Sequence, residues 1–143
     1  MTTLTTAKPS IAVYRGKTLD WHEYRHTSLF FEFEDGTPHF QAHAVGRASR
    51  FVFEQQNIDP RTSARLAKLV SVGPLRSQVD LEQLLSVLCA VPILYDDLEY
   101  NCQNWCEKAL GCLVDQRLLT KSDYETAFDG MIDAVMQAED YIE

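Results

Sequence analysis

The segment HTSLFFEFEDGTPHFQAHAV, residues 26–45, predicts the centre of the fold. The segment is rich in β-branched and aromatic residues, and it contains stretches in which side chains alternate between apolar and polar, a pattern typical of half-buried β-strands. Asp35-Gly36 lies between its two halves and favours the positive φ angles of a tight hairpin turn. The segment therefore predicts a β-hairpin.

The turn also determines which side chains share a face of this hairpin. A two-residue turn at Asp35-Gly36 pairs Ser28 with His43, which makes His26 and His43 diagonal neighbours on one face, with Cβ atoms about 7 Å apart. A three-residue turn would move one histidine to the other face. His39 lies on the same face, but roughly 13 Å along the strand from His43, so it is not included in the pair.

Away from the hairpin, the period of the hydrophobic pattern changes along the chain. Residues 11–14 and 51–53 have the composition of further strands. Beyond Pro60 the pattern repeats every 3.6 residues, which predicts helices, and Gly73-Pro74 interrupts it. Strands thus dominate the first part of the chain and helices the second.

Three helices are predicted in the second part. Asp80 and Gln83 form a capping box before the first helix, and Pro92 ends it. The second helix opens at Asn101, and the third follows Ser122. The second helix has an apolar stripe with the spacing of one helix face. Its members are Cys102, Trp105, Cys106, Ala109, Leu110 and Leu113.

This order of elements predicts an α+β domain in which the helices pack on one face of an antiparallel sheet. The 143 residues, 45% of them hydrophobic and 24% charged, have the length and composition of one globular domain. Residues 1–10 are expected to form a flexible N-terminal arm. A domain of this size needs no metal or cofactor to complete its core, so none is expected.

Composition also excludes several classes of partner. The chain has 13 Lys and Arg against 21 Asp and Glu, a net charge of -8, so nucleic acid is not an expected partner. No stretch approaches 18 consecutive apolar residues, and no secretory signal pattern is present, so we expect a cytoplasmic protein without a membrane partner. In that reducing compartment the four cysteines are expected to be free thiols.

Cys102 is the candidate nucleophile because of its place in the second helix. Asn101 is a preferred N-cap residue, which puts Cys102 in the first turn, where backbone N–H groups and the helix dipole favour a thiolate. Cys102 also begins the apolar stripe, so its side chain is expected to point toward the sheet. The alternative is a small buried side chain with a packing role only, as for Cys106.

His26 and His43 would complete a site around this thiol. If the helix N-terminus packs on the face that carries both histidines, His26 can take the thiol proton and His43 can orient His26. The alternative is that both are half-exposed strand residues without such a role.

A family resemblance is carried by HTSLFF at 26–31, by Asp35-Gly36 and His43 after it, and by NCQNW at 101–105. Together these motifs resemble the circularly permuted NlpC-like branch of the papain-like cysteine fold. That branch includes lecithin retinol acyltransferase-like proteins and PPPDE deubiquitinase-like peptidases. The Asn-Cys-Gln-x-Trp pattern also looks like that of a set of small fungal proteins.

The resemblance implies a thiol-dependent acyl hydrolase or acyltransferase that acts on an amide, ester or thioester through a cysteine thioester. Its substrate would be a small molecule or a peptide. In this sequence Cys102 would be the nucleophile, His26 the base and His43 the third polar member. The rest of the motif, Asn101, Gln103 and Trp105, would contact the substrate.

Two other functions fit the same residues. Cys102 and Cys106 are four residues apart on one helix face, and with both histidines they would form a Cys₂His₂ zinc set. The stripe that contains them reads more simply as core, so no metal site is predicted. The main alternative is a non-catalytic binding module on a papain-like scaffold, since a fold does not determine a function.

Overall fold

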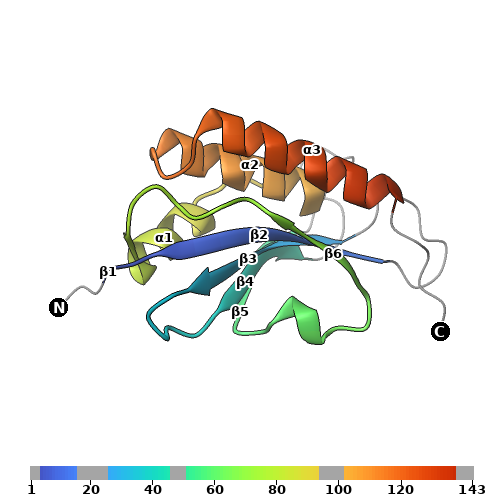
Figure 1. The fold of residues 1–143 in the computed structure, drawn as a ribbon, viewed down its shortest axis with the longest axis horizontal. Coiled ribbons are helices and arrows are strands. Elements are labelled where there is room, and N and C mark those ends of the chain that lie inside the picture. The colour runs from blue at the N-terminus through green and yellow to red at the C-terminus, as the bar shows by residue number, and fades with distance from the viewer. Residues whose placement is uncertain (1–3, 16–25, 46–50, 94–101, 138–143) are drawn as a thin grey trace.

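The computed structural model describes residues 4–15, 26–45, 51–93 and 102–137. In this part of the chain, a five-stranded antiparallel sheet lies beneath two long helices, and two short strands pair separately (Figure 1). The predicted α+β class is confirmed. The strands are β1 (Leu4–Thr5), β2 (Ala7–Tyr14), β3 (Thr27–Phe33), β4 (Phe40–Val45), β5 (Val52–Gln56), β6 (Leu66–Ser71) and β7 (Val79–Asp80). The helices are α1 (Leu81–Cys89), α2 (Cys102–Asp115), α3 (Lys121–Gln137) and a 3-10 turn, η2 (Pro60–Thr62).

The main sheet has the strand order β5-β4-β3-β2-β6, and β1 pairs with β7. Leu29 pairs with Ala42 and Phe31 with Phe40. This is the register that a turn centred on Asp35-Gly36 predicts, so the hairpin prediction is confirmed.

The connection between β3 and β4 is longer than the predicted two-residue turn, because it spans residues 34–39. Gly36 has the predicted positive φ, 86°. The Asp35 carboxylate accepts hydrogen bonds from the backbone N–H (3.0 Å) and the hydroxyl (2.6 Å) of Thr37. This side-chain bonding is typical of aspartate in turns. The register is nevertheless the predicted one, since burial of one face fixes it independently of the turn.

The face of the sheet beneath α2 and α3 is apolar. All six residues of the predicted α2 stripe are buried against it. The side chains that the sheet contributes come from alternate strand positions, among them Ile11, Val13, Leu29, Phe31, Ala42 and Ala44. Helix α2 packs on these side chains and lies across β3 and β4.

Helix α3 packs over β6 and β2, with a glycine at the closest approach. A Cβ atom at Gly130 would lie 2.8 Å from Cγ1 of Val70, too close for any real contact. The β-branched Val70 side chain has little freedom to move aside. Gly130 therefore allows α3 to lie closer to the sheet than an alanine would.

The segment around η2 lies against part of the other face of the sheet, and Figure 1 shows it on the side away from α2 and α3. The Arg61 guanidinium lies 5.5 Å from the centre of the Phe30 ring and pairs with the Glu32 carboxylate at 2.8 Å. Phe30 is fully buried. The η2 segment thus covers the sheet around Phe30 on the side away from the helices.

Three predictions about elements are wrong. Residues 4–10, expected in a flexible arm, lie in β1 and β2. Residues 66–71, expected in a helical region, form the edge strand β6 beside β2. Helix α3 begins at Lys121, because the Thr120 hydroxyl, rather than Ser122, accepts the N–H of Asp123.

The capping prediction for α1 is correct in position but not in chemistry. Asp80 is the N-cap residue, as expected, yet its side chain makes no capping hydrogen bond. Asp80 instead belongs to β7 and pairs with Leu4 of β1. Among the described residues, none of the helices has the length and apolar content that crossing a bilayer requires.

Candidate active site

The strands β3 and β4 separate at one end of their ladder. They pair from Leu29 to Phe31 of β3, but not beyond. At the same end, Thr27 still pairs with β2, and Val45 still pairs with β5. We call the space between residues 26–28 and 43–45 the β3–β4 opening.

Cys102 occupies the position in this opening that a β4 carbonyl would otherwise take. The His26 carbonyl accepts the Tyr14 N–H at 2.9 Å, toward β2. The Thr27 N–H belongs to the same peptide group. Because that group is trans, the N–H points in the opposite direction, toward β4. It donates to Cys102 Sγ at 3.3 Å. The sulfur therefore lies at the sheet itself, beside the peptide that joins His26 to Thr27.

The two predicted histidines meet in the same opening. His26 Nε2 lies 2.7 Å from His43 Nδ1, and the ring centres are 4.8 Å apart. This confirms the prediction that His26 and His43 share a face as neighbours. The Tyr14 ring packs against His26 on this face, at 5.6 Å between centres.

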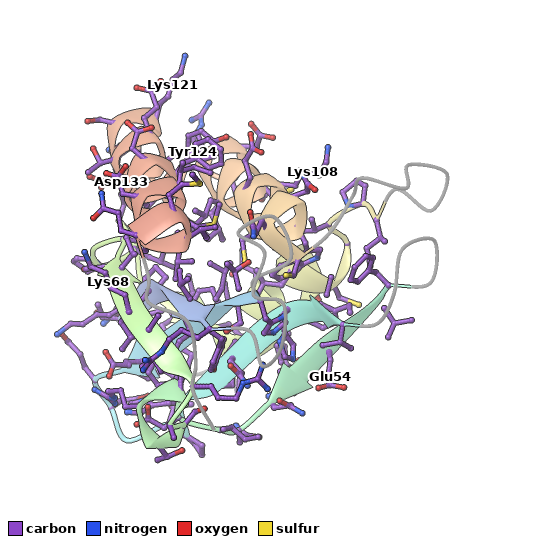
Figure 2. All side chains as sticks on the ribbon, turned by 90° about the vertical axis from the view of Figure 1, so that its right-hand side faces the viewer. Glu54, Lys68, Lys108, Lys121, Tyr124 and Asp133 are labelled. Atoms are coloured by element: carbon purple, nitrogen blue, oxygen red, sulfur yellow. The ribbon has the colours of Figure 1, made fainter. Side chains whose placement is uncertain are left out.

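Glu54 of β5 extends the histidine pair and was not predicted. It stands across from His43 in the β4–β5 ladder, and its Oε1 lies 3.3 Å from His43 Nε2. Figure 2 shows Glu54 on the side of the sheet away from α2 and α3. The signal for it was present in the sequence, since the register between residues 40–45 and 51–56 would have placed it opposite His43.

The carboxylate of Glu54 determines which ring nitrogens carry protons. A carboxylate accepts, so His43 Nε2 donates to it, and a neutral His43 then has an unprotonated Nδ1. His26 Nε2 must donate to that Nδ1, which leaves His26 Nδ1 as the unprotonated, basic nitrogen. The chain from Glu54 to His26 thus selects the base form of His26.

Burial keeps both imidazoles neutral. Burial, with smaller contributions from the nearby His43 and Arg65, lowers the pKa of His26 to about 4. Burial also lowers the pKa of His43, although the hydrogen bond and charge of Glu54 oppose this. At neutral pH His26 is therefore a proton acceptor.

The Cys102 thiol is protonated in the resting protein. Burial raises its pKa, and the hydrogen bonds from Thr27 offset this only in part. The side chain is 6% exposed. The expectation of a thiolate at the helix N-terminus is therefore wrong, because burial outweighs the N–H groups of the first turn.

The predicted face of the helix contact is also wrong. Helix α2 packs on the face opposite to the histidine rings, since Trp105 contacts Phe53 at 5.8 Å between ring centres and Phe53 alternates with Glu54. At the β3–β4 opening, Cys102 of α2 contacts the backbone of the sheet itself. The candidate site therefore lies where β3 and β4 separate, and not in the cleft between helix and sheet that the sequence predicts.

The remaining predicted residues are placed differently. Asn101 lies outside the described residues, and Gln103 is half-buried in the first turn of α2. Trp105 is fully buried in the core, where its ring packs against Phe53 of β5. His39 lies at the other end of the β3–β4 ladder, where its Nδ1 accepts the N–H of Phe33 at 3.1 Å.

Cys106 lies one turn after Cys102, on the same side of α2. Its thiol donates to Thr27 Oγ1 at 3.3 Å, and burial raises its pKa strongly. Within the described part of the chain, no group of three or more His, Cys, Asp or Glu side chains is arranged to hold a metal ion. The Cys₂His₂ zinc set considered for Cys102, Cys106 and the two histidines therefore has no support.

Comparison of the chain with protein-family models, with curated proteins and with solved structures gave no match. The chemistry of the β3–β4 opening is therefore the basis for proposing a function.

Proposed function

We propose that the protein is a thiol-dependent acyl hydrolase or acyltransferase of the permuted papain-like type, with Cys102 as nucleophile and His26 as base. One observation carries the proposal. The hydrogen-bond chain from Glu54 through His43 prepares His26 Nδ1 as a proton acceptor, and it ends beside the strand opening that holds Cys102 Sγ.

The first half of the reaction forms a thioester. Cys102 Sγ attacks the acyl carbon of an amide, ester or thioester while its proton passes to His26 Nδ1. The carbonyl oxygen becomes an oxyanion, for which the backbone N–H groups in the first turn of α2 are suitable donors. As the bond to the leaving group breaks, His26 returns the proton to that group.

The second half releases the acyl group. Water or another acceptor gives a proton to His26 and attacks the thioester carbon, and Cys102 leaves as a thiol after regaining the proton. The His43–Glu54 pair stabilises the imidazolium that His26 becomes in each half. Because the thiol and the imidazole are both neutral at rest, His26 acts by general base catalysis and no ion pair exists beforehand.

The burial of Cys102 restricts what can react. With 6% of the side chain exposed, only a narrow acyl group or an extended peptide segment could reach the sulfur through the opening. The cysteines in the described residues, Cys89, Cys102, Cys106 and Cys112, are all free. Free thiols fit the reducing conditions of the cytoplasm, where we place the protein.

A non-catalytic binding module is the second candidate. The burial of Cys102 and the neutral state of its thiol favour it, since both lower the reactivity of a cysteine. In that case the polar residues of the opening would serve only to fix the fold or to bind a ligand.

The two functions are separated by acyl transfer from p-nitrophenyl acetate. The acylation proposal predicts release of p-nitrophenolate together with an acetyl group on Cys102, located by mass spectrometry of peptides. Cys102→Ala should remove the reaction, whereas Cys89→Ala, at an exposed thiol outside the site, should leave it unchanged. Acetylation of Cys89 with none at Cys102 would instead support the binding module.

A further inference from the structure

Thr27 contacts two sulfur atoms of α2, that of the proposed nucleophile Cys102 and that of Cys106. Thr27 is fully buried, and its N–H donates to Cys102 Sγ at 3.3 Å. A side-chain hydrogen bond from Thr27 also lowers the pKa of the Cys102 thiol. On the other side, the Cys106 thiol donates to Thr27 Oγ1 at 3.3 Å. The three residues form a continuous polar chain between α2 and the sheet.

We propose that Thr27 and Cys106 are positioning residues for the Cys102 nucleophile: Cys106 orients the Thr27 hydroxyl, and Thr27 directs two donors at Cys102 Sγ. This inference rests on the proposed function and adds two residues to it. Neither touches the substrate in the proposed reaction.

The direction of the bonds gives Thr27 this role. A hydroxyl has one hydrogen to donate, and the Cys106 thiol occupies an acceptor position of Oγ1. The hydroxyl hydrogen is then left to point at Cys102 Sγ. With the backbone N–H and the hydroxyl both directed at the sulfur, the thiol hydrogen of Cys102 must point away from Thr27. It can then face the base.

The same two donors act on the charge that forms during the reaction. A buried thiolate is costly unless hydrogen bonds replace its lost hydration. The Thr27 N–H and hydroxyl are in place before the proton leaves, so they need no rearrangement as the charge develops. Packing alone does not require this arrangement, because valine has the shape of threonine and would fill the same apolar surroundings.

The test compares four variants and two readouts. Thr27→Val removes the hydroxyl and keeps the shape, while Thr27→Ser restores the donor. Cys106→Ala removes the thiol donor, and Cys112→Ala changes a half-buried cysteine further along α2 as a matched control. The readouts are the rate of Cys102 acetylation by p-nitrophenyl acetate and the thiol pKa of Cys102, followed by iodoacetamide labelling against pH.

Thr27→Val should slow acetylation about 10- to 100-fold, the usual effect of one hydrogen bond to a charged group. It should also raise the thiol pKa of Cys102. Thr27→Ser should retain most of the rate, Cys106→Ala should show a smaller loss in the same direction, and Cys112→Ala should show none. Urea unfolding of each variant separates these effects from loss of folded protein.

The outcomes distinguish this inference from the proposed function. If wild type acetylates Cys102 and Thr27→Val leaves both the rate and the thiol pKa unchanged, the inference is overturned and the proposed function stands. If wild type does not acetylate Cys102, the proposed function fails. The labelling pKa then still decides whether Thr27 directs its donors at the sulfur, since iodoacetamide reacts with any accessible thiolate.

Discussion

The β3–β4 pair contains two regions that differ in backbone pairing and in the polarity of their side chains. In the closed region, Leu29 to Phe31 pair with Phe40 to Ala42, and the side chains facing the helices are apolar and fully buried. In the β3–β4 opening, the strands are apart and the Thr27 N–H bonds to a cysteine sulfur. The first region obeys the rules of a stable sheet, whereas the second departs from them. Such departures are expected where a fold makes room for function.

The opening is polar but well bonded. His43, Ser28 and Gln41 are buried there or beside it, and Ser28 Oγ donates to Gln41 Oε1 at 3.0 Å. Tyr14 donates to the same oxygen at 2.9 Å. The strands are therefore not separated by a packing defect, because the polar groups between them have partners.

The largest effect is expected from the closed region. Phe31 is fully buried and stacks on Phe40 at 5.2 Å between ring centres. Phe31→Ala should lower the free energy of unfolding by about 3–5 kcal/mol, measured by urea denaturation. Val52→Ala, at a side chain 54% exposed on β5, should change it by no more than about 0.5 kcal/mol. A small effect of Phe31→Ala would mean that the closed region is not what holds the hairpin together.

In the opening, the next largest effect is on the pH dependence of stability. Burial lowers the pKa of His26 from 6.5 to about 4, so the unfolded chain binds the proton more readily. Above pH 6.5 His26 is neutral in both states, so its burial does not lower the free energy of unfolding. As the pH falls toward about 4, the unfolded chain gains a proton that the folded protein does not, and the free energy of unfolding decreases. The loss amounts to about 3 kcal/mol.

Urea denaturation at intervals across that range measures this loss. His26→Gln, which has no proton to gain, should show a flatter dependence than wild type. Identical pH dependence in the two proteins would contradict the burial of a neutral His26.

A smaller effect is expected at the outer end of the opening. Glu54 is 41% exposed, so its hydrogen bond to His43 is weakened by solvent. Glu54→Gln should slow Cys102 acetylation by about threefold to tenfold, because a neutral amide stabilises the imidazolium less well. Glu54→Asp should recover part of the rate if the charge matters. A rate unchanged in Glu54→Gln would remove Glu54 from the chain that orients His26.

The smallest effect is expected at the surface of the hairpin. Lys8 and Glu34 form an ion pair at 3.0 Å, with both side chains more than half exposed. Lys8→Ala should change the free energy of unfolding by less than about 1 kcal/mol, and still less at high salt. A larger loss in urea denaturation would show that ion pairing supports the closed region.

Much of the closed region could be predicted from the sequence. Asp35-Gly36 and the alternation around it gave the correct register, and the α2 stripe was correct at all six positions. These features depend on local patterns that burial enforces directly. β6 was missed, because Leu66, Leu69 and Val70 in its sequence have the spacing of a helix face, and only pairing with β2 makes the segment a strand.

The opening could be predicted only in part. The meeting of His26 and His43 follows from the register. The position of Glu54 opposite His43 follows from the register between β4 and β5. The side of the sheet that α2 covers and the protonated state of Cys102 do not follow from a register, because each depends on contacts between distant segments. The pKa of Cys102 in particular reflects a burial that the helix position alone does not reveal.

The most direct test of the account is the pH–rate profile of Cys102 acetylation by p-nitrophenyl acetate in wild type and in His26→Ala. His26 is neutral above about pH 4 and the thiol stays protonated beyond neutrality, so base-assisted attack predicts a nearly flat rate between about pH 5 and pH 8. His26→Ala should convert this plateau into a rise of about tenfold per pH unit, as an unassisted thiol shows. A wild-type profile that already rises in this way, and that His26→Ala leaves unchanged, would contradict the pairing of Cys102 with His26.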